Sequence, residues 1–177
     1  MCLAKWGEKR ANAGYDMIPS SDLEEGIRLC SRNVDQLLKD ASSLFQSGSY
    51  GHAQALAILA MEEYAKKIVL VAEKAYPNRF DDEIRRSFWD HDFKLKLALD
   101  MLMREFPDDP SGEQAANIVM ELAAKLLSLR QISLYVDYDN QQGWFDPNKA
   151  DYRDVATVQI KYAHELVRRV DAWLTKI

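Results

Sequence analysis

Residues 53–61 read AQALAILAM, and this run decides the expected fold because small and apolar side chains occupy nearly every side of it. A helix that is apolar all round is normally buried. Its alanines also let neighbouring helices approach closely. We therefore expect a helix over about residues 49–76 at the centre of a bundle. Pro77 ends it, and residues 77–82 should form a polar connector.

Four further helices are predicted around this centre. Ser21 is placed to N-cap the first of them, with Glu24 three residues on as its capping-box partner. About two residues join this helix to the central one, so the two should be antiparallel neighbours. No stretch alternates as a β-strand would. The spacing of apolar residues places these four helices over about residues 21–46, 90–106, 111–136 and 151–175, with a loop over residues 137–149.

The sequence thus predicts an all-α protein, an antiparallel helical bundle of about five helices. Its 177 residues, of which 47% are hydrophobic, suffice for one domain with a buried core. We expect this single helical domain over residues 21–177, after a loosely ordered arm over residues 1–20.

Composition limits the class of function. The net charge of −5 excludes a wholly basic surface but leaves room for a local basic cleft. Cys2 and Cys30 cannot supply a zinc site alone, and two isolated cysteines favour a reduced, cytoplasmic setting. No apolar run approaches the roughly 20 residues that span a bilayer, so we expect no membrane association. With no phosphate-binding loop, dinucleotide fingerprint or di-iron pattern, we expect neither metal nor cofactor.

Three polar blocks interrupt the apolar pattern, and the first follows the central run. Glu62 with Lys66, and Glu63 with Lys67, are spaced as i,i+4 pairs. On a helix surface such pairs contribute only about 0.2–0.5 kcal/mol each. The two pairs are separated by about 100° around the helix, so one can face inward, where an unpaired charge is costly. Glu63 and Lys66 are therefore candidate binding residues.

The second block is His91-x-x-Lys94, with Asp90 as a possible N-cap. Residues three apart share a helix face. An imidazole beside an ammonium group suits phosphate binding and proton transfer, so His91 is a candidate catalytic residue and Lys94 a candidate binding residue. The ordinary alternative is a surface histidine near the start of a helix.

The third block runs from Arg130 to Asp137, near the end of an otherwise apolar helix. Arg130 can bind a phosphate or a carboxylate through its guanidinium fork. Tyr135 offers a phenolic donor. Both are candidate catalytic residues, and Asp137 is a candidate binding residue. Alternatively, Arg130 bridges to Glu62 or Glu63 and Tyr135 packs as an ordinary aromatic.

The order of these blocks resembles one family. Residues 48–66, which include LAMEEYAK, are similar to the second helix of AbiV-type abortive-infection proteins, and His91-x-x-Lys94 and Leu134-Tyr135-Val136-Asp137 follow in matching order. The resemblance covers about residues 22–171. It implies a bundle of the HEPN group, whose members commonly dimerise. Many are metal-independent ribonucleases with an arginine and a histidine that are separated by four to six residues.

The chain departs from that motif. Arg130 matches the arginine, but Tyr135 stands at the first position open to the histidine, and no histidine has the allowed spacing. The usual general base is therefore missing. Tyr135 could donate a proton or orient a phosphate, and His91 could substitute from another helix.

Two main hypotheses follow. The first is a cytoplasmic, homodimeric antiphage or toxin-type protein acting on RNA, in which Arg130 and Lys94 hold phosphate and His91 or Tyr135 transfers a proton. The second is a non-catalytic module that binds a phage or host protein, in which Glu63, Lys66, His91 and Arg130 form a buried structural network. A third is a bundle that binds a nucleotide phosphate at the same cluster.

Overall fold

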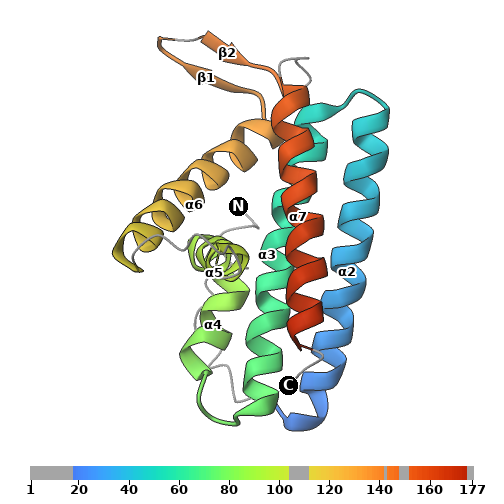
Figure 1. Ribbon diagram of the computed structural model, residues 1–177. Helices are drawn as coiled ribbons and strands as arrows, with labels where there is room; N and C mark the ends of the chain where they lie inside the picture. The colour runs from blue at the N-terminus through green and yellow to red at the C-terminus, as the bar shows by residue number, and fades with distance from the viewer. Residues whose placement is uncertain (1–17, 104–111, 142, 148–151, 175–177) are drawn as a thin grey trace, which may run out of the picture.

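The structure is a computed structural model that describes residues 18–103, 112–141, 143–147 and 152–174. Its helices form a bundle, with a small hairpin at one end (Figure 1). The all-α prediction is confirmed, with six helices among the described residues. The elements are α2 (Ser20–Gln46), α3 (Tyr50–Ala75), α4 (Asp81–Trp89), α5 (His91–Met103), α6 (Gly112–Leu134), β1 (Asp137–Asp139), β2 (Gly143–Phe145) and α7 (Arg153–Leu174).

The central position predicted for residues 49–76 is confirmed in α3. This helix contacts α2, α4, α5, α6 and α7. The alanines at positions 53, 55, 57, 60 and 65 are at most 1% exposed, so neighbouring backbones approach α3 on several sides. In Figure 1, α2 runs antiparallel to α3 and α7 runs parallel to it, while α5 and α6 lie on the side of α3 away from α2.

The main hydrophobic core lies around the middle of α3. Ile58, Met61 and Tyr64 on α3 pack with Leu95 on α5 and Leu166 on α7. All of them are at most 1% exposed. Burying a large apolar side chain contributes about 1.5–3 kcal/mol, so this contiguous cluster supplies most of the packing energy. Within the described residues, no helix is both long and apolar enough to cross a bilayer.

Polar contacts also join α3 to α7. The hydroxyl of Tyr64 donates to Asp171 of α7 at 2.7 Å, and Nζ of Lys67 donates to the same carboxylate oxygen at 2.6 Å. Burial, followed by the hydrogen bond to Asp171, raises the pKa of Tyr64 above its ordinary value. The i,i+4 pairing predicted between Glu63 and Lys67 is therefore wrong.

The start of α2 differs from the prediction. The helix begins at Ser20 and has Pro19 as its N-cap residue, without a side-chain cap. Ser21 donates to Asp22 instead, and Glu24 pairs with Lys74 at the end of α3. The capping-box prediction is thus wrong, because an interhelical partner is available to Glu24. Most of the predicted arm, residues 1–17, lies outside the described residues.

Helix α4 was not predicted. The buried carboxylate of Glu73 accepts the backbone N–H groups of Asn78 at 2.6 Å and Phe80 at 3.2 Å, which organises the turn before the helix. Asn78 has a φ of 64°, a left-handed conformation that asparagine tolerates better than most residues. With nine residues, and with Ile84 and Ser87 as its buried contacts, α4 is too short to show helical periodicity in the sequence.

The hairpin corrects the predicted loop over residues 137–149. Strands β1 and β2 are antiparallel, with Tyr138 opposite Trp144. Strands of three residues are too short to reveal alternation. After the hairpin, Pro147 packs on the first turn of α3, where a Cβ added to Gly51 would lie 2.0 Å from the carbonyl oxygen of Pro147. Gly51 thus permits this close approach.

Candidate functional site

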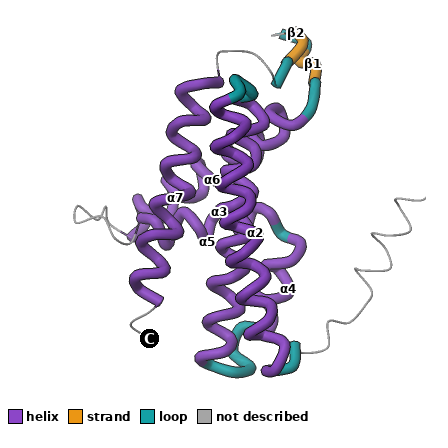
Figure 2. The backbone as a smooth tube through the Cα atoms, turned by 90° about the vertical axis from the view of Figure 1, so that its right-hand side faces the viewer, coloured by secondary structure: helices purple, strands orange, loops and turns teal. Residues whose placement is uncertain are grey.

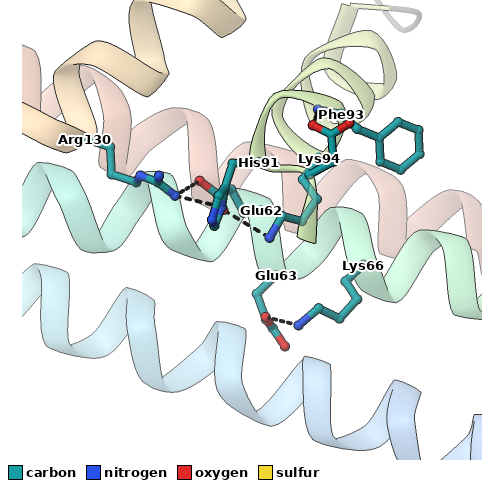
Figure 3. A network of polar contacts seen from close by, with 8 residues as sticks. Glu62, Glu63, Lys66, His91, Phe93, Lys94 and Arg130 are labelled. Atoms are coloured by element: carbon teal, nitrogen blue, oxygen red, sulfur yellow. Dashed lines mark hydrogen bonds and ion pairs between the residues drawn. The ribbon is translucent and has the colours of Figure 1, made fainter. Parts of the chain in front are cut away.

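The carboxylate of Glu62 lies at the centre of the candidate site, on α3. Glu62 is 2% exposed. Nη1 of Arg130, from α6, donates to Oε1 at 2.6 Å, and Nδ1 of His91, from α5, lies 2.5 Å from Oε2. Nζ of Lys94, also from α5, lies 3.3 Å from Oε2 (Figure 3). Two helices, α5 and α6, thus bring three basic side chains to one buried carboxylate on α3.

The N-cap of α5 positions two of these side chains. Oδ1 of Asp90 accepts the backbone N–H of Phe93 at 2.9 Å, which confirms Asp90 as the cap. Its Oδ2 accepts from Nη2 of Arg86 at 2.9 Å and from Nε at 3.2 Å. Burial opposes ionisation, but the Phe93 N–H and the Arg86 guanidinium together lower the pKa of Asp90 below its usual value. His91 is therefore held as the first helical residue, with Lys94 on the same face.

The three basic side chains differ in their access to solvent. The side chain of Lys94 is 7% exposed and that of Arg130 is 15% exposed, whereas that of His91 is 47% exposed. Burying Lys94 and Arg130 requires a compensating anion, which Glu62 supplies. His91 is the member of the cluster that an external molecule can reach most readily.

The contact with Glu62 determines how the imidazole of His91 is protonated. An ionised carboxylate only accepts hydrogen bonds, so Nδ1 of His91 must carry the proton that bridges to Oε2. Nη1 of Arg130 lies 2.9 Å from the same Nδ1. Because a protonated Nδ1 cannot also accept, this approach is a close contact between two donors to Glu62. In the neutral imidazole, the lone pair is then on Nε2.

The basic groups of the cluster outnumber its carboxylate. One carboxylate, Glu62, faces two basic groups, the guanidinium of Arg130 and the amino group of Lys94, before His91 is counted. The N-terminus of α5 adds partial positive charge. In the described contacts Arg130 donates to Glu62 through Nη1. The cluster is therefore suited to an anion with several oxygens, such as a phosphate.

The structure brings together His91, Lys94 and Arg130 from the candidates named in the sequence. It does not add Glu63 and Lys66 to them. These two pair with each other at 2.8 Å on the side of α3 that faces α2, and Lys66 lies 5.2 Å from the ring centre of Phe88 (Figure 3). The predicted network of Glu63, Lys66, His91 and Arg130 is thus corrected: Glu62 is its carboxylate.

Two candidate residues, Tyr135 and Asp137, follow the end of α6 and take no part in the described contacts around Glu62. The side chain of Tyr135 is 59% exposed. Five residues of helix turn it roughly 140° from Arg130. Among the described contacts, Tyr135 makes none with Glu62 or His91. Asp137 begins β1, with its backbone opposite Phe145, and its side chain lies outside the described part of the chain.

Glu62 was not among the candidate site residues named from the sequence. Its signal in the sequence was a carboxylate directly after a run that is apolar on every side. Among the described residues, no group of three or more His, Cys, Asp or Glu side chains is arranged to hold a metal ion.

The fold and the site define a helical-bundle protein whose central helix presents a buried carboxylate to basic groups from two other helices. Among known families, the HEPN AbiV family, described as AbiV, matches residues 22–168. The chain therefore belongs to this family, as its motifs predicted, and is an abortive-infection protein of the AbiV type. No curated protein and no solved structure gives a significant match.

Proposed function

We propose that this AbiV-family protein acts on RNA in antiphage defence, as a ribonuclease in which His91 takes the place of the missing motif histidine. The observation that carries the proposal is the 2.5 Å contact between Nδ1 of His91 and the buried Glu62. A carboxylate that holds Nδ1–H orients an imidazole so that Nε2 can accept a proton, and it stabilises the imidazolium that results.

The proposed reaction uses four side chains. Arg130 and Lys94 hold the oxygens of a phosphodiester. Nε2 of His91 removes the proton of the neighbouring 2′-hydroxyl, whose oxygen attacks phosphorus and breaks the bond to the 5′ oxygen. The imidazolium, paired with Glu62, returns the proton to that leaving oxygen. The products are a 2′,3′-cyclic phosphate and a 5′-hydroxyl. Tyr135 has no step in this scheme, because it stands apart from the described cluster contacts.

A matched substitution tests His91 directly. The side-chain amide of an asparagine can replace Nδ1–H but has no equivalent of Nε2. His91→Asn should therefore keep the bond to Glu62 and the melting temperature, while cleavage of total RNA in EDTA falls by at least about 100-fold, the usual contribution of a general base. His164→Asn, at an exposed position of α7, is the control and should cleave normally. Equal cleavage by His91→Asn and the parent protein would refute the role of His91.

A non-catalytic binding module is the second candidate. It is favoured by the burial of Glu62 and Lys94, whose side chains are 3% and 7% exposed, as in a cluster that fixes helix packing. In that case the parent protein cleaves no RNA in EDTA and causes no RNA loss in cells, while Arg130→Ala still lowers the melting temperature.

We also propose that the protein is a cytoplasmic homodimer. Helix α6 supports the dimer, because Ile118 and Leu122, which are four residues apart and therefore share a helix face, are exposed large hydrophobic residues. Exposed apolar surface of this kind commonly marks an interface. Sedimentation should detect a dimer that Leu122→Glu dissociates and that Trp173→Glu, on α7, leaves intact. A monomeric parent protein would refute it.

A further inference from the structure

The hairpin segment, residues 135–146, carries the most exposed large hydrophobic side chains of the described chain. Tyr135, Val136 and Trp144 are 59%, 65% and 68% exposed, more than any other large hydrophobic residue described. All three lie within twelve residues of sequence. Exposed single hydrophobics are common, but three gathered on one projecting element indicate a surface that a partner covers.

Both ends of the hairpin segment are attached to the bundle. It continues directly from α6, and Pro147 packs on Gly51 of α3. Between these points, antiparallel pairing fixes Asp137 opposite Phe145. In both backbone views the hairpin projects at the end of the bundle where α2 ends and α3 begins (Figures 1 and 2). The segment is therefore presented in a defined position, which lowers the entropic cost of binding.

The negative charge of the hairpin segment favours a partner of positive charge. Residues 135–146 contain no lysine, arginine or histidine, and besides Asp146, which has an interaction within the chain, they contain Asp137 and Asp139. Like negative charges repel the phosphates of a nucleic acid. They attract lysine and arginine, and exposed aromatic rings add cation–π contacts. The sign is opposite to that of the Glu62 cluster, in which basic groups outnumber the carboxylate.

We propose that the hairpin segment is a docking surface for a protein partner rich in lysine and arginine, with Trp144 as its apolar anchor. Trp and Tyr are the residues that most often dominate binding at such interfaces. The proposal does not depend on whether the protein cleaves RNA.

Binding of three probes to the full chain tests this surface. An alternating lysine–leucine peptide should bind, with an affinity that falls as salt rises. An alternating glutamate–leucine peptide and a single-stranded oligouridylate should not bind at the hairpin. Trp144→Ser should weaken the lysine–leucine peptide at least tenfold, as expected for an anchor residue. The pair Asp137→Asn and Asp139→Asn should weaken it and flatten the salt dependence.

Trp173→Ser is the matched control, because Trp173 is 42% exposed on α7, outside the hairpin segment. Melting temperatures should show that each variant is folded. Unchanged peptide binding by Trp144→Ser would overturn the proposal, since the peptide would then recognise only the net negative charge. Binding of the oligouridylate that depends on Trp144 would also overturn it. So would dissociation of a dimer by Trp144→Ser, because the occupant would then be a second copy of this chain.

Discussion

Replacing Glu62 with glutamine tests how much stability the chain gains from the carboxylate that compensates Arg130 and Lys94. The carboxamide can accept from Arg130 at Oε1, but its NH2 then faces Nδ1–H of His91 and the ammonium of Lys94. Arg130 and Lys94, with side chains 15% and 7% exposed, lose the anion that compensates them. Removing one partner of a buried ion pair costs about 3–5 kcal/mol. For a chain of this size that predicts a fall in melting temperature of roughly 6–20 °C.

Glu63→Gln is the control, since it makes the same change one residue along α3. Its partner Lys66 lies 2.8 Å away, and both side chains are nearly one-fifth exposed. The Glu63 side chain is 19% exposed, against 3% for that of Glu62, and pairs with one cation rather than two, so this variant should lose less stability than Glu62→Gln. Urea unfolding at pH 7 measures both variants. Comparable losses in the two would refute the argument that Glu62 alone compensates buried cations.

The Glu62→Gln variant should also respond differently to added phosphate. Without the carboxylate, the cluster has two basic groups and no anion, so added phosphate should raise the melting temperature of Glu62→Gln more than that of the parent protein. Equal stabilisation of both proteins would show that phosphate does not bind at this cluster.

Three other perturbations follow from local contacts. Asp90→Ala removes the cap of α5 and should lower the free energy of unfolding in urea by about 0.5–2 kcal/mol. The pKa of Asp90 is lower in the folded chain than in the unfolded chain. The contribution of Asp90 to stability is therefore present above its pKa in the unfolded chain and is lost as pH falls through its pKa in the folded chain. Gly51→Ala places a Cβ 2.0 Å from Pro147 and should displace the hairpin, detected as faster amide exchange over residues 137–145. Gly26→Ala, whose Cβ would meet only the end of the flexible Leu70 side chain at 3.2 Å, should leave that exchange unchanged. Burial, then the charge of Glu63, raises the pKa of Cys30 to about 12, so the native thiol should resist alkylation at pH 8 that proceeds in urea, as peptide mapping would show. Because that pKa is raised, the stability linked to Cys30 is complete below the unfolded pKa and declines between it and about 12.

The central helix could be predicted because its signal is local. Alanines on every side of residues 53–61 require neighbours on every side, whichever helices provide them. Local spacing also identified His91 and Lys94, which are three residues apart and share a helix face, and Arg130 was identified by its place near the end of an otherwise apolar helix. Their convergence on one carboxylate depends on how α5 and α6 cross α3, and no local spacing contains that information.

The choice between Glu62 and Glu63 shows where the local signal ends. Both have a lysine four residues later, and they differ by about 100° in direction. Only the position of α2 on one side and α6 on the other determines which is buried. Helix α4 and the hairpin were missed for another reason: elements of nine and three residues contain too few positions for a period to emerge.

The Glu62 cluster also has a consequence for biosynthesis. Its members come from positions 62, 91, 94 and 130, so a ribosome must extend the chain well past α5 before the last of them emerges. A nascent or prematurely terminated chain that lacks α6 has neither the guanidinium nor the helix that holds it against α3. The cluster is therefore complete only in a chain whose synthesis has passed residue 130.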